Sequence, residues 1–365
     1  MEMQKIYSNE KGTVIAYAES RIGGRPENQD AFGWFEVPRG YLVTVCDGMG
    51  GGPGGKTAST IAVNEIVRCV AEASADEDCA NILKKAIRNA NMAIIQTGNN
   101  HPKLKGMGAT ATVLWVTEHA AYAAHVGDSR IYQLRGKRKV FRTFDHSMVF
   151  NMVEQGVITE EQARLSAQSN VITRAMGIKP DVEVDVRELS YEKGDHFVLC
   201  TDGIHGTMPE KDLLRLLTNN KLSLGALVDD VATSVDNLGR SKGGGHDNLT
   251  IAMVETKVNS KLKVPMNKRT KIVVATLVAL ALASISVNFM QMHSNSAAVC
   301  AADSVKMLKD SIAQQSKVIE TCKSQTDSLA NMVKSVKAMN EKNEKIAKIV
   351  NELQETVKQQ SSATK

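Results

Sequence analysis

The stretch YLVTVCDGMGGGPGGK, residues 41–56, places an aspartate where an apolar run meets a glycine-rich loop. The run at residues 41–46 has the length and composition of a buried strand, and residues 55–73 have the spacing of a helix. A glycine-rich loop ahead of a helix can bind a phosphate group. Such a loop needs no aspartate at its start, so Asp47 requires another explanation.

Other apolar runs in the chain show the same design. YAAHVGDSR carries Asp128, HFVLCTDG carries Asp202 and GGGHDNLTIAMV carries Asp247, while RPENQDAF places Asp30 ahead of a further apolar run. A single aspartate beside a strand is usually a turn former. If these strands pack together, however, their ends bring the carboxylates to one place, where a cation is needed to cancel their repulsion.

The ligand chemistry of such a cluster favours hard ions. Oxygen ligands without a histidine or cysteine cluster select Mg²⁺ or Mn²⁺ over zinc. Two such ions about 3.5 to 4 Å apart would activate a water molecule against an electrophile. The pattern therefore predicts a hydrolase for phosphate esters.

Residues 1–255 alternate short β-rich runs with amphipathic helices, which predicts one large folded domain. We expect strands at residues 14–18, 41–46, 111–116, 121–126, 131–135, 182–189, 196–201 and 249–254, and helices at 55–73, 78–96, 147–155, 160–167, 210–218 and 224–238. Short turns join many strands, and long helices come in pairs. This arrangement favours an α+β fold over a doubly wound parallel sheet.

Eight motifs carry a resemblance to a known family. In order they are RPENQD (25–30), VCDGMGG (45–51), GMGATATVLW (106–115), HVGDSRIYQL (125–134), DHSMV (145–149), NVITRAMG (170–177), LCTDGIHGTM (199–208) and HDNLTIAMV (246–254). Over residues 12–255 the chain resembles the bacterial metal-dependent protein serine/threonine phosphatases of type 2C. The resemblance implies two central antiparallel sheets with helices on both outer faces, and hydrolysis of phosphoserine and phosphothreonine in proteins.

The same resemblance implies a metal-binding role for particular residues. Asp47 would bridge two Mn²⁺ or Mg²⁺ ions, and the Gly48 carbonyl would bind the second of them. Asp202 and Asp247 would hold the first ion. Asp128 resembles the residue linked to a third, weaker ion in bacterial members.

Two further residues would act on the substrate and on the water. Arg25 would bind the substrate phosphate through its two-pronged guanidinium group, and Asp30 would orient water and nearby ligands from behind the metals. The chain departs from the family pattern at Gly52, where a histidine usually stands, so a histidine general acid is not available in this loop. It also has Gly206 where the family often has an aspartate for the third ion, which weakens the prediction for Asp128.

Two other functions stay open from the sequence. One is a membrane-anchored pseudophosphatase that binds phosphoproteins without turnover, which the intact metal ligands and Arg25 argue against. The other is a phosphatase for a small metabolite, because substrate choice depends on loops. Cys46 lies within a strand pattern and is expected in the core, and the six cysteines have no zinc-ligand spacing.

The C-terminal third of the chain has a different organisation from the phosphatase-like domain at 1–256. Residues 272–290, IVVATLVALALASISVNFM, are 19 residues without a charge, enough for one transmembrane helix through a hydrocarbon core of roughly 30 Å. The alternative is a buried core helix. Six Lys and Arg residues at 257–271 precede this run, and the positive-inside rule then places the N-terminal domain in the cytoplasm of a single-pass inner or plasma membrane protein.

The flanking segments complete this interpretation. The basic linker at 257–271 sets topology and is expected to meet anionic lipid headgroups, although a solvated linker has the same composition. Because the net charge of +5 is concentrated there, we expect no nucleic-acid partner. Residues 294–365 lack glycine, proline and aromatic residues and repeat apolar residues at helical spacing. They predict an extracytoplasmic coiled coil for self-association, or else a single solvated helix.

Overall fold

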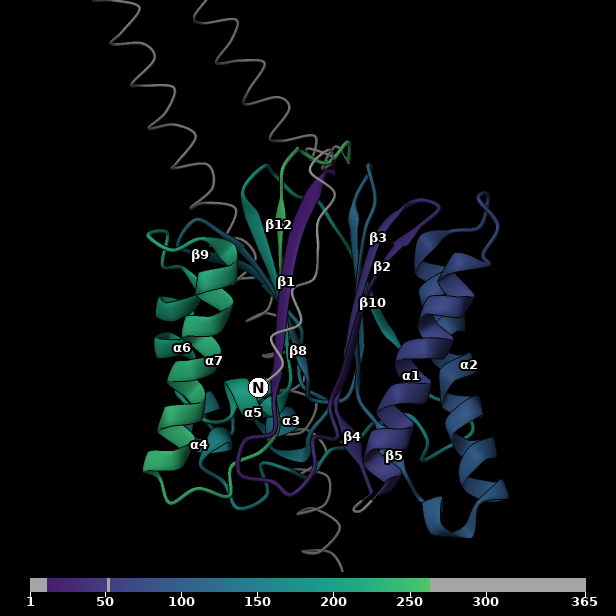
Figure 1. Cartoon of the computed structure of the whole chain (residues 1–365), viewed down its shortest axis with the longest axis vertical. Coiled ribbons are helices and arrows are strands. Elements are labelled where there is room, and N and C mark those ends of the chain that lie inside the picture. Colours follow the sequence, from purple (N-terminus) through teal and green to yellow (C-terminus); the bar gives the residue numbers. More distant parts are fainter. Residues whose placement is uncertain (1–11, 51–52, 263–365) are drawn as a thin grey trace, which may run out of the picture. The chain divides into compact units, whose positions relative to one another are not determined.

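The computed structural model describes residues 12–50 and 53–262 (Figure 1). The predictions for residues 272–290 and 294–365, and the departure at Gly52, lie outside these residues. Within the described ranges, no helix has both the length and the apolar content needed to cross a bilayer.

Two five-stranded sheets form the centre of the domain. The first sheet has the order β1 (Val14–Arg21), β12 (Leu249–Thr256), β11 (Asp195–Cys200), β8 (Arg130–Arg135) and β9 (Arg138–Arg142). The second has the order β10 (Asp185–Leu189), β7 (Ala121–Val126), β6 (Ala111–Val116), β3 (Gly40–Cys46) and β2 (Ala31–Val37). All neighbouring strands in both sheets are antiparallel, which confirms the predicted α+β class.

A pair of helices lies outside each sheet, as Figure 1 shows. The second sheet is covered by α1 (Pro53–Ala71) and α2 (Cys79–Asn100), and the first by α6 (Glu210–Leu217) and α7 (Leu224–Ser241). The side chains of Asp78 and Ser223 accept hydrogen bonds from backbone N–H groups in the first turns of α2 and α7. These caps satisfy donors that have no partner within the helix and so fix where both helices begin.

An apolar cluster between the two sheets holds them together. Val43 and Leu114 of the second sheet pack in this cluster with Phe197 and Leu199 of the first. Because each sheet is covered on both faces, every residue of β6 and β7 is buried. This explains why these strands read as continuous apolar runs rather than as alternating patterns.

The shorter elements connect these layers near one end of the sheets. They are β4 (Gly48–Met49), β5 (Gly108–Ala109), the 3₁₀ helix η1 (Pro102–Leu104), α3 (Met148–Glu154), α4 (Glu160–Arg164) and α5 (Asp202–His205). Four strands, β2, β4, β5 and β9, are not among the predicted ranges. Strand β9 has the sequence RKVFR with its first three residues exposed, so it has neither an apolar run nor a clear alternation.

Residues 257–262, here called the strap, stay attached to the domain after β12 ends. The backbone N–H of Ser260 donates to the carbonyl of Tyr191 at 2.8 Å, and that of Leu262 donates to the carbonyl of His119 at 2.7 Å. The accepting turns lie at the ends of the sheets opposite those that carry the aspartates. The strap therefore fixes the point at which the chain leaves the described domain.

Candidate active site

The aspartates predicted from the strand ends converge at one end of the two sheets. Asp47 follows β3 and Asp30 precedes β2 in the second sheet, whereas Asp202 follows β11 and Asp247 precedes β12 in the first. Asp128 lies in the turn that crosses from β7 in the second sheet to β8 in the first. Since neighbouring strands are antiparallel, a residue that precedes one strand lies at the same end of the sheet as a residue that follows the adjacent strand.

Most of the predicted site residues line a single pocket of about 390 Å³. They are Arg25, Asp47, Gly48, Asp128, Asp202 and Asp247. Asp30 is buried behind this pocket, and its Oδ2 accepts hydrogen bonds from the hydroxyls of Thr201 at 3.0 Å and Thr250 at 2.6 Å. Both sheets thus contribute to one acidic centre.

Burial and mutual repulsion disfavour the charged forms of four of these carboxyl groups, Asp30, Asp47, Asp128 and Asp202. Burial raises the pKa of Asp202 to about 6, with the charge of Asp247 as the next cause. Burial is also the main reason why the pKa of Asp30 rises to about 7 and those of Asp47 and Asp128 rise well above their ordinary values. Oδ1 of Asp202 and Oδ1 of Asp30 are buried and lack a hydrogen-bond partner. Oxygen donors of this kind fit a hard divalent cation, which would stabilise their ionised forms.

The loop after Asp47 brings two backbone segments into close approach. A Cβ atom on Gly48 would lie 2.0 Å from the carbonyl oxygen of Gly55 and 2.7 Å from that of Gln29. No side chain fits at that position, so the glycine is required for the loop to pass beside the carboxylates. Because residue 48 has no side chain, only its backbone carbonyl can bind a metal ion.

Arg25 lies at the mouth of the pocket, where its side chain is 47% exposed. Its Nη2 donates to Oδ2 of Asp247 at 2.9 Å. An arginine beside a cluster of carboxylates, still open to solvent, is positioned to meet an incoming phosphate group.

Asn248 is a positioning residue that the sequence analysis did not single out. Its Nδ2 donates to the carbonyls of Ile22 at 2.8 Å and Glu27 at 2.9 Å, and its Oδ1 accepts from the backbone N–H of Gln29 at 2.9 Å. These bonds hold the loop that carries Arg25 against the loop that carries Asp247. Its place directly after Asp247 was the only signal in the sequence.

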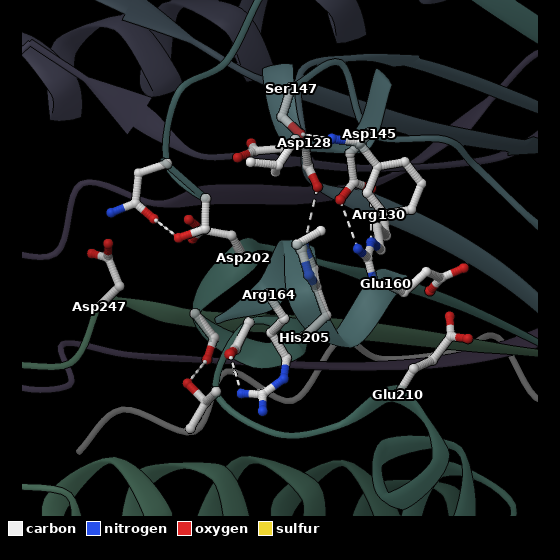
Figure 2. Close-up of a pocket in the computed structure, with 18 of the residues that line it drawn as sticks. Asp128, Arg130, Asp145, Ser147, Glu160, Arg164, Asp202, His205, Glu210 and Asp247 are labelled. Atoms are coloured by element: carbon white, nitrogen blue, oxygen red, sulfur yellow. Dashed lines mark hydrogen bonds and ion pairs between the residues drawn. The ribbon is translucent and has the colours of Figure 1, made fainter. Parts of the chain in front are cut away.

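A second pocket of about 690 Å³ adjoins the first and is lined by residues of α3, α4 and α5 and by the first residues of α6. Figure 2 shows Asp202 and Asp247 on one side of it, with a buried ion pair between Arg130 and Asp145 on the other. The guanidinium of Arg130 donates to both carboxylate oxygens of Asp145, at 2.7 and 2.6 Å. This ion pair with two hydrogen bonds fixes the wall of the second pocket that lies opposite Asp202 and Asp247.

The histidines near the site have structural contacts. His125 is buried in β7 and stacks on His146 with ring centroids 4.4 Å apart, as expected for a packed residue. His146 precedes the cap of α3, which is Ser147, and its Nδ1 accepts from the N–H of Gly127. His205 is buried, and its Nε2 donates to the carbonyl of Asp128 at 3.0 Å. That bond fixes the orientation of the His205 ring.

The cysteines of the described domain, Cys46, Cys69, Cys79 and Cys200, are free thiols. Cys46 is fully buried in β3, and burial raises its pKa to about 12. Burial raises the pKa of Cys200 to about 12 as well. Thiols of this kind are poor nucleophiles, which fits the assignment of Cys46 to the core.

Comparisons with known proteins agree with this geometry. The sequence profile of the family described as "Protein phosphatase 2C" matches residues 19–224. The serine/threonine phosphatase stp of Listeria monocytogenes is 32% identical over 241 residues, which cover 65% of this chain and 93% of that protein.

Solved structures show the same fold. The S. agalactiae serine/threonine phosphatase matches with a TM-score of 0.60 and 31% identity, over 67% of this chain and all of that one. The catalytic domain of the serine/threonine protein phosphatase PstP, solved with two manganese ions, matches with a TM-score of 0.55 and 27% identity, over 67% of this chain and 98% of that one.

The two-sheet fold and the acidic pocket with an arginine at its mouth are those of a metal-dependent hydrolase of phosphate esters. The chain belongs to the protein phosphatase 2C family.

Proposed function

We propose that this chain, a serine/threonine protein phosphatase of the 2C family, hydrolyses its phosphoprotein substrates at the acidic pocket, with two Mn²⁺ or Mg²⁺ ions held by Asp47, the Gly48 carbonyl, Asp202 and Asp247. The observation that carries the proposal is the convergence of aspartates from both sheets in one pocket. Divalent ions there would lower the pKa of water and neutralise charge on the phosphate oxygens. Asp128 would be a ligand of a weaker third ion.

Other residues would bind the phosphate and align the metal ligands. Arg25 orients the phosphate at the pocket mouth, where its guanidinium can bind two phosphate oxygens at once. Asp30 stays behind the pocket, fixed by Thr201 and Thr250, and aligns the neighbouring ligands. Cys46 is buried in the core, which supports direct hydrolysis without a cysteine-bound phosphate.

The direct test measures phosphate release from a phosphothreonine peptide by the full-length protein, with Mn²⁺ and with EDTA. We expect turnover with Mn²⁺ and its loss in EDTA, restored when Mn²⁺ is added back. Peptide binding without turnover in any divalent ion would identify a pseudophosphatase. Turnover confined to small phosphorylated metabolites would identify the other alternative.

Replacing Arg25 with alanine should weaken use of the phosphopeptide without abolishing metal binding. A hydrogen bond to a charged group is worth about 1.5 to 3 kcal/mol, which corresponds to a loss of roughly tenfold to a hundredfold in kcat/KM. The loss should appear mainly as a higher KM, and Arg25→Lys should recover only part of it because it lacks the two-pronged donor. An unchanged KM for both variants would remove Arg25 from the phosphate site.

The sequence also supports a membrane-anchored arrangement. Its 19 uncharged residues at 272–290, preceded by basic residues at 257–271, suit one membrane span with the phosphatase domain in the cytoplasm. Residues 294–365 would then lie outside and associate as a coiled coil.

This arrangement predicts that the protein sediments with membranes and resists high-salt extraction. The double change Leu277→Arg and Leu280→Arg should release it into the soluble fraction. In intact cells, a membrane-impermeant thiol reagent should label Cys300 and Cys322 but not Cys69. Labelling of Cys69 alone would reverse the orientation, and soluble wild-type protein would rule out the anchor. Monomeric behaviour of the full-length protein in ultracentrifugation would exclude self-association.

A further inference from the structure

One imidazole ring fixes the loop that leads into Asp247. His246 is largely buried, with a side chain 9% exposed, and its Nε2 lies 2.8 Å from Oδ1 of Asp236. Because a carboxylate can only accept, Nε2 carries the proton and donates it to Asp236. Nδ1 of His246 is buried and has no hydrogen-bond partner.

The acceptor, Asp236, belongs to the last turns of α7 and is itself held in place. Arg240 donates to both of its oxygens, at 3.2 and 3.1 Å, and Arg21 of β1 lies 3.7 Å from Oδ2. Burial acts to raise the pKa of Asp236, but the hydrogen bonds from Arg240 and His246 keep it below its ordinary value. The imidazole is thus tied to an ionised group on a rigid helix.

The helix surface is shaped to receive the ring. A Cβ atom on Gly239 would lie 2.3 to 2.8 Å from three atoms of the His246 ring. Three glycines with positive φ, Gly243, Gly244 and Gly245, join α7 to His246, and a Cβ on any of them would meet nothing within 4 Å. Their glycine character therefore serves the turn of the backbone, whereas Gly239 leaves room for the ring.

The same segment also supports the loop that carries Arg25. The N–H of Gly24 donates to the carbonyl of His246 at 2.9 Å. A Cβ on Gly24 would lie 2.4 Å from the nitrogen of Gly245, so the two backbones are in direct contact. Arg25 follows Gly24 and Asp247 follows His246, so movement of His246 would displace both of these pocket-lining residues.

We propose that His246 is a positioning residue whose hydrogen bond to Asp236 sets Asp247 for a divalent ion and Arg25 for the phosphate. The proposal rests on the assignment of Asp247 as a metal ligand. His246 acts through its neighbours rather than on the substrate, because Nε2 is bound to Asp236 and Nδ1 is enclosed. Partners of this kind behind a metal ligand typically change metal affinity by about 10- to 100-fold when they are removed.

The test is Mn²⁺ binding to the full-length protein by isothermal titration calorimetry, combined with steady-state kinetics on a phosphothreonine peptide. His246→Leu keeps the bulk and removes the donor, and it should raise the Kd for Mn²⁺ by roughly tenfold or more. The KM for the peptide should rise as well, while kcat at saturating Mn²⁺ should change less. His246→Gln can still donate to Asp236 and should keep the Kd within about threefold of wild type.

Val231→Ala serves as the matched control, since Val231 is buried in α7 away from this contact. It should lower the melting temperature without changing the Kd for Mn²⁺. If His246→Leu does not fold, Asp236→Leu removes both acceptor oxygens from the other side of the bond and should raise the Kd in the same way.

Two results would overturn the proposal. One is a wild-type Kd in His246→Leu or Asp236→Leu, and the other is an equal loss in His246→Leu and His246→Gln, which would indicate packing alone. Failure of the wild-type protein to bind Mn²⁺ would instead refute the metal site itself, so the two failures are distinguishable.

Discussion

Changing Asp47 to asparagine should lower kcat/KM for a phosphothreonine peptide by about a thousandfold or more. Asp47 lines the acidic pocket, where desolvation raises its pKa and the neighbouring carboxyl groups of Asp30 and Asp202 raise it further. Metal charge at such a site contributes several kcal/mol to the transition state, and each 1.36 kcal/mol is about tenfold in rate. The measurement is initial-rate kinetics at saturating Mn²⁺.

Folding of this variant can be separated from its chemistry. Since the asparagine removes one of several repelling charges, the variant should melt no lower than wild type in EDTA. Asp76→Asn is a suitable control, because Asp76 lies in an exposed turn away from the pocket and should keep wild-type kinetics. Wild-type activity in Asp47→Asn would refute the proposed metal centre.

Changing Asp145 to alanine should cost about 3 to 5 kcal/mol of folding free energy, because it leaves the buried guanidinium of Arg130 without its carboxylate. Arg130 is 9% exposed at its side chain and has both of its short hydrogen bonds to this one partner. For a domain of this size, we expect the melting temperature to fall by roughly 10 °C. Urea denaturation of the full-length protein, followed by tryptophan fluorescence, gives the free energy directly.

Asp181→Ala is the matched control for this effect. Asp181 also faces an arginine, Arg88, but the pair is 3.9 Å apart and the aspartate side chain is 91% exposed. Exposed pairs of this kind contribute little, so its denaturation midpoint should match wild type. Equal stability of the Asp145 and Asp181 variants would show that the buried pair contributes nothing to folding.

The sequence predicted the parts of the site that belong to regular strands. Asp47, Asp202 and Asp247 each adjoin an apolar run long enough to identify as a strand, and the antiparallel order of those strands brings their ends together. The fold class followed from the same alternation of strands and paired helices. The predicted ranges for β3, β6 and β7 agree with the structure to within one residue.

The rest of the site depends on contacts between distant loops, which leave no periodic signal. Asn248 is one residue from a predicted ligand, yet its hydrogen bonds to residues 22–29 arise only when β1 and β12 pair. The bond between His246 and Asp236 likewise requires α7 to end beside the glycine turn. The partner of Arg130 follows a hairpin, and only the pairing of β8 with β9 brings Asp145 back to it.

The strap and the acidic pocket lie at opposite ends of the domain. The strap bonds the last described residues to the turns after β6 and β10, whereas the site aspartates adjoin the other ends of the strands. A surface, bead or fusion partner joined directly after residue 262 would therefore be attached at the end of the domain opposite the acidic pocket. If the acidic pocket is the active site, an enzyme immobilised in this way would keep that pocket open to phosphorylated proteins.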